Sequence, residues 1–441
     1  MTKLRPAYIF SFGLLLTLFA GFVYYPVSNE LVAVKVNPPD SLVMPEPPHP
    51  VPVNYVAAID APNPFLHQAI LNYKSFIEKG IRNKLAPGAA VAIVHDSSII
   101  LLQGFGVKVA GTQDSVDINS VFRLGSVSKS MAAILAGTLV NSKLIAWDDP
   151  VVTYYPNFQL QSEEHARQLT IRQVLSHTTG LPYHAFTNMV EEHLSLDTLL
   201  TNLKTVKLVA PPGQVYSYQN VGYSLIEKVV SAATQQDFET ALKDRVFQPL
   251  GMHNSSASYQ AIVNNPNVAK PHHFNRKEWV PVPISDTYYN VQAAGGVNAS
   301  IADMALWLKA LMQGNLLMTD SVLAQIFEPQ VKAISKNRNF YRWQRPRASY
   351  YALGWRVIQF PNQTLLYHGG YVNGYRSEVA IDQKNKIAIC VLTNSAGQLA
   401  DVAVPEFFKM ISAKADSIKW WENQTNPRWV KHTSPAYPVS K

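Results

Sequence analysis

Two side chains spaced three residues apart, Ser126 and Lys129, carry the clearest chemistry in this sequence. An uncharged, alanine-rich run follows at 131–139, and if it is helical the spacing puts the hydroxyl and the amine on one face of the first turn. A serine there lies near free N–H groups that favour a developing negative charge. A desolvated lysine can take the proton of a nearby hydroxyl, which would make Ser126 a nucleophile. The alternative is an ordinary capped helix with an unrelated lysine, because S-x-x-K also occurs by chance.

Two later stretches contain further residues that suit the same chemistry. Tyr218 and Asn220 follow a Pro-Pro-Gly turn and precede an apolar run at helical spacing. In an extended segment the i, i+2 spacing turns both side chains to one side, although they could instead only cap the next helix. The second stretch is a histidine with two glycines, beginning at His368, at the end of a strand-like run. A lone histidine is more often structural, so His368 matters only in combination with the other motifs.

Together these motifs resemble those of the serine β-lactamase and penicillin-binding protein superfamily, namely S-x-x-K, Y-x-N, and K-T-G or its H-x-G variant. Y-x-N as the second motif resembles class C β-lactamases and their relatives, which include D,D-peptidases, D-aminopeptidases and esterases. The resemblance extends from about Pro64 to about Ile411. It implies an α/β (α+β) fold, with an antiparallel sheet flanked by helices, an inserted all-helical subdomain, and the active site between them. It implies no cofactor.

The resemblance also assigns roles to individual residues. The implied catalytic residues are Ser126, Lys129 and Tyr218. The implied substrate-binding residues are Asn220, His368, Gly369, Gly370 and Tyr371. In this assignment the tyrosine of Y-x-N passes a proton to the leaving group, and its asparagine hydrogen-bonds the substrate amide. The backbone N–H groups of Ser126 and Tyr371 would form the oxyanion hole.

Several of these roles depend on electrostatics. Tyr218 could act as a base only if a nearby cation lowered its pKa, and Lys129 is the candidate. His368 stands where K-T-G has a lysine, which weakens any claim to a dedicated β-lactamase. A cationic His368 could hold a substrate carboxylate, whereas a neutral one could only donate a hydrogen bond. Arg376 is a second candidate for that carboxylate or else a packing residue, and His177, in a Ser-His-Thr-Thr-Gly loop, is interpreted as structural.

The apolar spacing predicts the elements that would position these residues. Helical patterns occur at 65–85, through most of 126–326 (including 221–233 and 300–311), and at 399–411. Strand patterns occur at 89–95, 99–104, 355–360, 364–368, 378–381 and 387–393. Strands at both ends of the chain imply one sheet assembled from distant segments, with the helical region packed beside it.

The N-terminal part has a different character. An uncharged apolar run at 7–25 follows a positively charged start and is long enough to span a bilayer, and no convincing cleavage site follows it. We therefore expect an uncleaved membrane anchor with the rest of the chain exported; a cleaved signal peptide, giving a secreted protein, is the alternative. The expected organisation is an anchor at 1–25, a Pro-rich linker at 26–58, a hydrolase domain at 59–415 and an unassigned C-terminal tail at 416–441.

The composition argues against several other functions. The net charge of +8 is modest for 441 residues and no long Lys/Arg run concentrates it, so nothing indicates nucleic-acid binding. Cys390 is the one cysteine and lies in an apolar run, which predicts a buried, inert thiol and rules out a Cys-rich metal site. H-E-x-x-H is absent, and no other metal-ligand pattern is found. G-x-S-x-G is also absent, which argues against an α/β-hydrolase.

We therefore interpret the sequence as that of an exported serine hydrolase that forms an acyl-enzyme. The resemblance implies β-lactams or D-amino-acid peptides as its small-molecule or peptide substrates. A carboxylesterase on the same scaffold is the alternative enzyme. A non-catalytic binding domain of the cell envelope is the alternative of another class, but the intact Ser126, Lys129, Tyr218 and Asn220 speak against it.

Overall fold

The protein is described from a computed structural model, in which residues 63–314, 317–333 and 346–425 are described. The expected membrane anchor at 1–25, the Pro-rich linker at 26–58 and the end of the tail lie outside these ranges, and their assignments stay predictions. Within the described ranges, no helix combines the length and the apolar character that crossing a bilayer requires.

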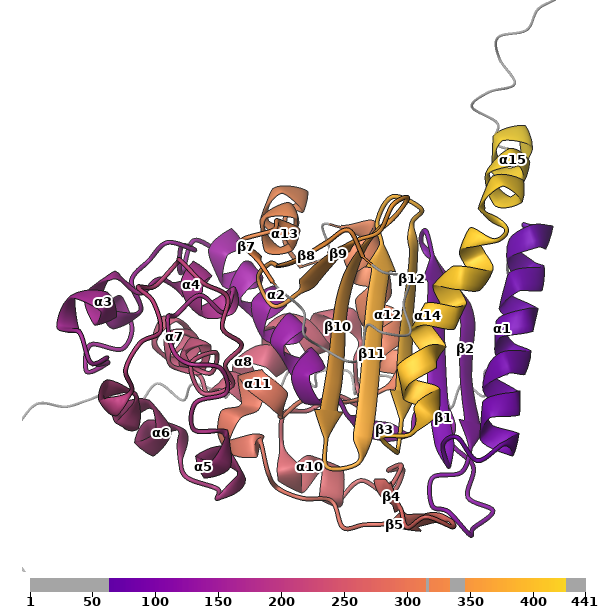
Figure 1. Cartoon of the computed structure of the whole chain (residues 1–441), viewed down its shortest axis with the longest axis horizontal. Helices are drawn as coiled ribbons and strands as arrows, with labels where there is room; N and C mark the ends of the chain where they lie inside the picture. Colours follow the sequence, from indigo (N-terminus) through magenta and orange to yellow (C-terminus); the bar gives the residue numbers. More distant parts are fainter. Residues whose placement is uncertain (1–62, 315–316, 334–345, 426–441) are drawn as a thin grey trace, which may run out of the picture. The chain divides into compact units, whose positions relative to one another are not determined.

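One antiparallel sheet of eight strands organises this part of the chain (Figure 1). The strand order is β2-β1-β12-β11-β10-β9-β8-β7, and each neighbouring pair is antiparallel. The strands are β1 (Gly88–His95), β2 (Ser98–Gly106), β7 (Val331–Lys332), β8 (Ala348–Tyr351), β9 (Arg356–Gln359), β10 (Thr364–Val372), β11 (Tyr375–Asp382) and β12 (Ile387–Thr393). The first strand of the chain thus pairs with the last, which confirms a sheet assembled from distant segments.

The central strands are covered on both faces. β12 is buried along its whole length and β1 along all but its last residue, which suits their continuous Ala, Val and Ile runs. Cys390 lies in β12 as a buried, free thiol whose pKa is raised by burial, in agreement with the expected inert cysteine. The β10–β11 turn consists of Asn373 and Gly374, whose φ angles of 40° and 86° suit a type I′ hairpin.

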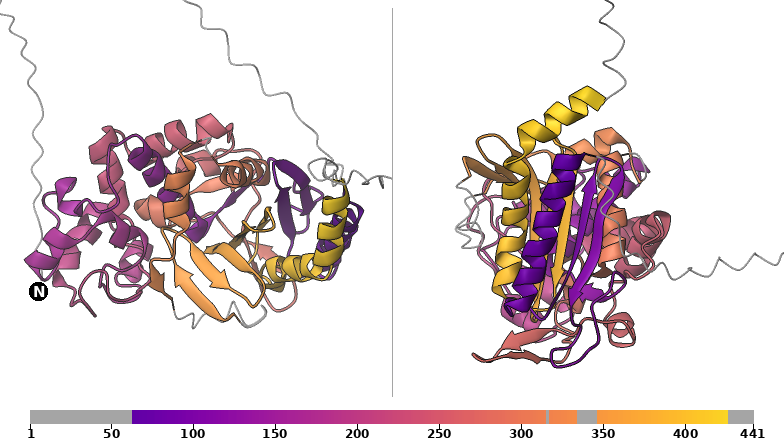
Figure 2. Two further views of the ribbon diagram at one scale, coloured as in Figure 1. Left: turned by 90° about the horizontal axis from the view of Figure 1, so that it is seen from above. Right: turned by 90° about the vertical axis from the view of Figure 1, so that its right-hand side faces the viewer.

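Helices pack against both faces of the sheet (Figures 1 and 2). On one face, α1 (Pro64–Arg82) and α14 (Gln398–Ser412) lie side by side and share an apolar core with the strands. Tyr73 and Phe407 join the two helices edge to face, with ring centroids 5.2 Å apart. On the other face, α2 (Ser128–Asn141) and α12 (Ile301–Gln313) form the larger core. The active-site residues described below lie at the end of this larger core.

The helical region lies between β3 (Val121–Arg123) and the C-terminal strands in sequence. Its further helices are α3 (Glu163–Gln168), α4 (Ile171–Leu175), α5 (Thr187–Glu191), α6 (Leu196–Asn202), α7 (Leu225–Thr234), α8 (Phe238–Leu242), α9 (Gln248–Leu250), α10 (Tyr259–Val263), α11 (Gln292–Gly295) and α13 (Asp320–Phe327). Part of this region has an apolar core of its own, which includes Leu169, Leu181, Leu199 and Val221. The inserted helical subdomain expected from the sequence is therefore present.

Short strands and one helix depart from the sequence-based expectation. Three of the four short strands lie within the segment predicted as mostly helical, and β3 lies just before it. β3 (Val121–Arg123) pairs with β6 (Asn298–Ser300), and β4 (His272–Phe274) pairs with β5 (Trp279–Pro281). Three-residue strands are too short to show a period-2 pattern. The tail that the patterns left unassigned begins with α15 (Ala415–Thr425), which is tied to the start of α1 by a 3.1 Å hydrogen bond from the Asn63 side chain to the Ile418 carbonyl.

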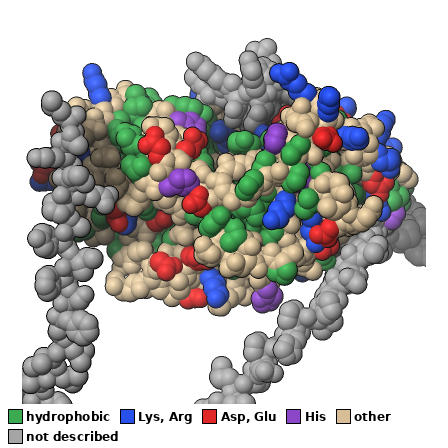
Figure 3. All heavy atoms as spheres, turned by 90° about the horizontal axis from the view of Figure 1, so that it is seen from below, with side chains coloured by type: hydrophobic (Ala, Val, Ile, Leu, Met, Phe, Trp, Pro, Cys, Tyr) green, Lys and Arg blue, Asp and Glu red, His purple; other side chains and the backbone are tan. Residues whose placement is uncertain are grey.

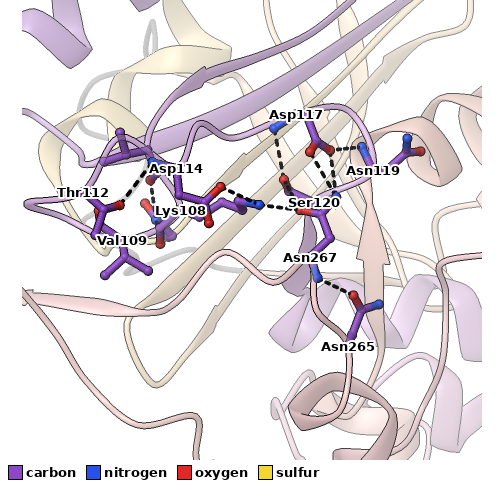
Figure 4. Close-up of polar contacts among 11 residues, drawn as sticks. Lys108, Val109, Thr112, Asp114, Asp117, Asn119, Ser120, Asn265 and Asn267 are labelled. Atoms are coloured by element: carbon purple, nitrogen blue, oxygen red, sulfur yellow. Dashed lines mark hydrogen bonds and ion pairs between the residues drawn. The ribbon is translucent and has the colours of Figure 1, made fainter. Parts of the chain in front are cut away.

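A polar network fixes the segment that enters β3 (Figure 4). The Lys108 amine lies 3.0 Å from Oδ1 of Asn267 and 2.8 Å from the carboxylate of Asp114. Ser120 donates to the same Asn267 oxygen at 3.0 Å, and the Asn267 amide donates to both carboxylate oxygens of Asp117 at 3.0 Å. These bonds join residues far apart in sequence just before the strand that leads to the candidate nucleophile.

Candidate active site

Ser126 lies in a three-residue 3-10 helix, η1 (Gly125–Val127), which runs directly into α2. The α-helix therefore begins at Ser128, two residues later than a helix starting at the serine would. Gly125 has a φ of 50°, and a Cβ at that position would lie 2.9 Å from the backbone of Tyr371. A glycine is required because the turn both needs a left-handed residue and presses against β10.

The edge of β10 that faces this turn has no strand partner over its last residues. β9 pairs with β10 only as far as Tyr367. On the other side, the type I′ turn makes Val372 and Tyr375 a hydrogen-bonded pair, so the N–H of Tyr371 points away from β11 and toward the open edge. The N–H of Ser126, in the first turn of a helix, likewise needs no intrahelical acceptor. The two backbone donors expected in an oxyanion hole are thus both available at this edge.

A second close contact holds the turn against the strand. A Cβ on Gly370 would lie 2.0 Å from the carbonyl oxygen of Leu124. The hydroxyl of Ser377 in β11 donates to the same carbonyl at 2.5 Å. A side chain at Gly370 would therefore push the nucleophile away from β10.

Lys129 is fully buried behind the serine. Its Nζ lies 2.8 Å from Oδ1 of Asn220, 2.7 Å from the carbonyl oxygen of Ala294 and 3.5 Å from Oγ of Ser126. Burial lowers the pKa of Lys129 well below its usual value, and the positive charge of Arg356 lowers it further. A neutral amine can donate its two hydrogens to the two carbonyl oxygens, which leaves its lone pair for the Ser126 hydroxyl. The geometry therefore suits Lys129 as a base.

Tyr218 is positioned to give a proton rather than to take one. Burial raises the pKa of Tyr218 above its usual value, although a hydrogen bond with Ser126 and the charge of Arg356 both lower it in part. The Lys129 amine lies 4.7 Å from the Tyr218 ring centroid, over the ring rather than beside the hydroxyl. The sequence suggested that Lys129 might turn this phenol into a base. The geometry instead favours a neutral phenol that relays a proton.

His177 supports the segment that carries Tyr218. Its Nδ1 accepts a 3.1 Å hydrogen bond from the N–H of Gln219, and the two rings of His177 and Tyr218 lie 4.3 Å apart between centroids. Burial, followed by the charge of Lys129, lowers the pKa of His177 well below its usual value, so the imidazole is neutral. These contacts agree with the structural role expected for this histidine.

A buried carboxyl group supports the helix that contacts Lys129. Oε1 of Glu227 in α7 accepts the N–H of Ala293 at 2.9 Å, and the next residue of α11 is Ala294, whose carbonyl binds the lysine. Burial raises the pKa of Glu227 to about 7, against the lowering effect of its hydrogen bonds. The sequence patterns did not indicate Glu227, because it lies within an ordinary helical run.

A cavity of about 240 Å³ lies beside Ser126. Of the residues that the sequence assigned to the site, it is lined by Ser126, Tyr218, Asn220, His368, Gly369, Gly370 and Tyr371. Lys129 lies behind the serine, outside the lining. The remaining lining residues are Gly125, Tyr183, His184, Tyr288, Gly295, Arg356, Tyr367 and Arg376. The structure therefore brings together three motifs that lie far apart in the sequence.

His368 uses both ring nitrogens within the protein. Nδ1 lies 3.0 Å from the carbonyl oxygen of Gly369 and must donate to it, and Nε2 lies 3.0 Å from the hydroxyl of Tyr351, from which it can accept. Burial lowers the pKa of His368 well below its usual value, and the charges of Arg356 and Lys129 lower it further. A neutral His368 with both nitrogens occupied is poorly suited to supply a positive charge to a substrate.

Among the cavity residues that the sequence patterns missed, Arg356 carries a positive charge. Its guanidinium carbon lies 5.7 Å from the ring centroid of Tyr218 and 5.6 Å from that of Tyr351. These tyrosines raise its pKa more than burial lowers it, and in the part of the chain that the structure describes no carboxylate forms an ion pair with it. A single arginine in the otherwise uncharged run at 355–360 was the one signal in the sequence.

Arg376, which the sequence suggested as a carboxylate ligand, is already neutralised. It forms a close ion pair with Glu378 and lies 3.6 Å from Asp401. Arg356 therefore offers the cavity a more available positive charge than Arg376 does. Over the described ranges, no group of three or more His, Cys, Asp or Glu residues is arranged to hold a metal ion.

The fold and the serine–lysine–tyrosine cluster define a serine hydrolase of the β-lactamase type. A family model described as Beta-lactamase matches residues 74–409, and the chain belongs to this family, whose members are serine hydrolases. This finding confirms the family and the fold class that the sequence motifs implied. The roles of the individual site residues stay predictions.

Curated relatives are distant. The chain is 24% identical to an unguisins hydrolase of Aspergillus violaceofuscus over 338 residues. These residues cover 70% of this chain and 58% of that protein. It is 35% identical to penicillin-binding protein 4 of Amycolatopsis lactamdurans over 169 residues. These residues cover 38% of this chain and 44% of that protein. The chain thus spans less than two thirds of the length of either relative.

Solved structures show the same fold. An octameric penicillin-binding protein homologue from Pyrococcus abyssi matches with a TM-score of 0.68 and 22% identity, over 79% of this chain and 77% of that one. EstCE1, a hydrolase with promiscuous acyltransferase activity, matches with a TM-score of 0.65 and 18% identity, over 78% of this chain and 98% of that one. At these identities the likeness extends to the fold alone.

Proposed function

We propose that this protein hydrolyses amides of the β-lactam or D-amino-acid peptide class through an acyl-enzyme at Ser126. The observation that carries the proposal is the position of the buried Lys129. Its amine donates to two carbonyl oxygens and lies 3.5 Å from the hydroxyl of Ser126. Burial lowers the pKa of this lysine, which favours the neutral amine that can take a proton from the serine nucleophile.

The reaction then proceeds in two halves. Lys129 takes the proton of Ser126 as Oγ attacks the carbonyl carbon, and the N–H groups of Ser126 and Tyr371 stabilise the oxyanion. When the bond to the leaving nitrogen breaks, that nitrogen takes a proton from the Tyr218 hydroxyl, and Lys129 returns its proton to the tyrosine. Water, deprotonated by the same groups, attacks the acyl-enzyme; the product acid leaves and Ser126 recovers its proton.

Arg356 supports a carboxylate on the leaving side of the substrate. Its guanidinium lies over the ring of Tyr218, the residue that protonates the leaving group. A partly buried guanidinium without an acidic partner among the described residues is stabilised by an anionic ligand. β-Lactams and peptides that end in a D-amino acid both carry a carboxylate on this side of the bond that breaks.

A carboxylesterase on the same scaffold is the second candidate. It is favoured by His368, which stands in place of the lysine of K-T-G and is held neutral by burial. An ester needs neither a cation there nor a strong proton donor for its leaving group.

Intact-protein mass spectrometry separates these possibilities. The protein is mixed in turn with a penicillin, an acyl-D-Ala-D-Ala peptide and a nitrophenyl ester, and acyl adducts and products are recorded. We expect adducts or turnover with the first two and their loss in Ser126→Ala. Adducts with the ester alone would favour the esterase, and no adduct or turnover with any of the three would leave a non-catalytic binding domain.

We also propose that residues 1–25 anchor the hydrolase to a membrane, with the catalytic domain on the exported side. The support is the uncharged run at 7–25. The full chain should remain with membranes after a high-salt wash, and its Ser126 should react with a probe that cannot enter cells. A mature N-terminus mapped just after Tyr25 would replace the anchor with a cleaved signal peptide.

A further inference from the structure

A buried carboxyl group lies one helical turn away from the lysine of the active site. Figure 3 shows acidic side chains scattered over one face of the surface, whereas Glu227, in α7, is only 8% exposed. The adjacent Lys228 forms its ion pair with Asp197, at 2.6 Å, and not with Glu227. Burying a carboxyl group costs free energy unless it is hydrogen-bonded. The partner that Glu227 has is the backbone of α11.

The helix α11 is a single turn without an N-terminal cap of its own. It spans Gln292–Gly295, and the residue before it is Val291, whose apolar side chain makes no capping hydrogen bond. Oε1 of Glu227 accepts the N–H of Ala293 at 2.9 Å, across 66 positions of sequence. The first N–H groups of a helix have no partner within the helix, and a polar N-cap side chain usually accepts from them. Glu227 supplies that acceptor to α11 from another helix.

The same turn of backbone binds the lysine. The carbonyl oxygen of Ala294 lies 2.7 Å from Nζ of Lys129, and Oδ1 of Asn220 lies 2.8 Å from the same nitrogen. Ala293 and Ala294 are fully buried, so water does not compete for these backbone groups. Two successive residues of α11 therefore join the carboxyl group of Glu227 to the amine.

The two carbonyl oxygens decide the direction in which the amine points. A neutral amine has two hydrogens and one lone pair. When Asn220 and Ala294 hold both hydrogens, the lone pair is left for Oγ of Ser126, 3.5 Å away. If the carbonyl of Ala294 moved, one hydrogen would be released and could turn to Oγ. The amine would then donate to the serine hydroxyl when it should accept a proton from it.

We propose that Glu227 is a positioning residue: by capping α11 it holds the carbonyl of Ala294 on Lys129, and so directs the lone pair of the amine to Ser126. The proposal rests on the proposed function, in which Lys129 takes the proton of Ser126. It requires an acceptor oxygen at position 227 and not a charge, because a carboxylate, a protonated carboxyl group and an amide can each accept an N–H group.

The kinetic test compares Glu227→Gln, which keeps an acceptor oxygen, with Glu227→Leu, which does not, in the full-length protein. The substrate is whichever of a penicillin, an acyl-D-Ala-D-Ala peptide and a nitrophenyl ester the parent turns over. We expect kcat to fall about tenfold in Glu227→Leu with KM within about twofold, because a misdirected base slows the chemical steps and leaves substrate binding unchanged. Glu227→Gln should retain most of the parent kcat.

Val229→Ala is the matched control for stability. Val229 is 1% exposed and lies two residues along α7 from Glu227, on the other side of the helix. Its truncation destabilises the same helix without removing an acceptor from α11. Thermal melts report the loss of Tm in each variant, and Val229→Ala should lose Tm while keeping the parent kcat.

The amine can also be observed without turnover. In protein isotope-labelled at the lysine amines, NMR follows the titration of Lys129, whose signal is identified by its absence in Lys129→Met. A carbonyl acceptor favours the charged amine, so we expect the pKa of Lys129 to fall in Glu227→Leu and to stay near the parent value in Glu227→Gln. The charge of Arg356 acts on this amine in every variant alike. This result supports the positioning role even if the parent turns over none of the three substrates, in which case the proposed function fails and the role of Glu227 stands.

Four results overturn the proposal. A parent-like kcat in folded Glu227→Leu would mean that α11 needs no cap from α7, and if no substrate is turned over, an unchanged pKa of Lys129 in that variant has the same meaning. Equal changes in Glu227→Gln and Glu227→Leu would mean that Glu227 acts through its charge. Equal losses of kcat in Val229→Ala and Glu227→Leu, at the same loss of Tm, would assign the effect to stability alone.

Discussion

Two neighbouring cavities favour different ligand groups. One is the arginine end of the active site, around Arg356, and the other is the cavity of about 530 Å³ between the β4–β5 hairpin and the β10–β11 turn, which we call the aromatic groove. At the arginine end, Tyr218, Tyr351 and His368 are buried, and the partly buried Arg356 lies against the two tyrosine rings. No carboxylate among the described residues balances its guanidinium. The aromatic groove is lined by no Asp, Glu, Lys or Arg, and two of its rings, Phe274 and Tyr371, are exposed to solvent. Burial of a charge favours an anionic ligand, and exposure of aromatic rings favours an apolar one. For the proposed hydrolase, we therefore expect the two cavities to bind different parts of a ligand, an anionic group near Arg356 and an apolar group near Phe274 and Tyr371.

Ser126 lies between the two ends, so its loss should have the largest effect. Ser126→Ala should lower kcat/KM by about 10⁴-fold or more for anionic and neutral substrates alike, since both pass through the same acyl-enzyme. Lys129→Met combined with Ser126→Ala should cost no more than Ser126→Ala alone, because the two groups act as a unit. Steady-state kinetics on one penicillin and one neutral ester test this. Parent-like turnover by folded Ser126→Ala would rule out the proposed mechanism.

The next largest effect should come from Arg356 and should differ between anionic and neutral substrates. Arg356→Gln should lower kcat/KM by about 10²-fold for a carboxylate-bearing substrate and much less for a neutral ester, because only the first loses a buried charge pair. Arg356→Lys, which keeps the charge, is the matched control and should retain part of the discrimination. Equal losses on both substrates would show that Arg356 supports the fold of the site and does not recognise a carboxylate.

The same substitution should also change the pH dependence. Activity needs a neutral Lys129, so kcat/KM should fall as pH drops through its lowered pKa. The charge of Arg356 is one cause of that lowering, so its removal in Arg356→Gln raises the pKa of Lys129 and moves the acid limb of the profile to higher pH. A neutral ester is used, so that carboxylate binding does not contribute. A limb that stays in place, or moves to lower pH, would contradict a lysine base.

The smallest effect concerns His368. Tyr351→Phe removes the hydroxyl that hydrogen-bonds Nε2 of His368, a loss of about 1 kcal/mol, and should lower kcat/KM about fivefold at most. Tyr350→Phe, on the opposite face of the same strand, serves as the control. The loss should not depend on the charge of the substrate, because His368 is neutral. A selective loss on anionic substrates would return the charge-recognition role to this histidine.

The sequence predicted long elements better than short ones. The last strand was expected at 387–393 and is observed at Ile387–Thr393, because it is a buried apolar run with clear ends. The helix expected at 65–85 is observed at Pro64–Arg82, where Asn63 caps its first turn. The β4–β5 hairpin was missed, because three-residue strands have no readable period and are held by bonds to remote backbone such as the carbonyl of Lys84.

Within the site, local spacing identified the first-motif residues, and the resemblance supplied the rest. Arg356 could not be found in either way, because its place in the cavity depends on β9 pairing beside Tyr367 in β10. The protonation states were also beyond the sequence. Burial, which no motif encodes, lowers the pKa of Lys129 and of His368 and raises that of Tyr218.

The order of strands in the sheet has a consequence for the newly made chain. β1 pairs with β12, and the open edge of β10 is the only source of the Tyr371 donor, so a nascent chain that has already exposed Ser126 and Lys129 still lacks half of its oxyanion hole. Such long-range pairing is slow to form. On the proposed mechanism, Ser126 of such a chain should not be acylated until β10 and the strands that pair with it have been made and have folded, so we expect the site to become reactive only after the whole domain has left the ribosome.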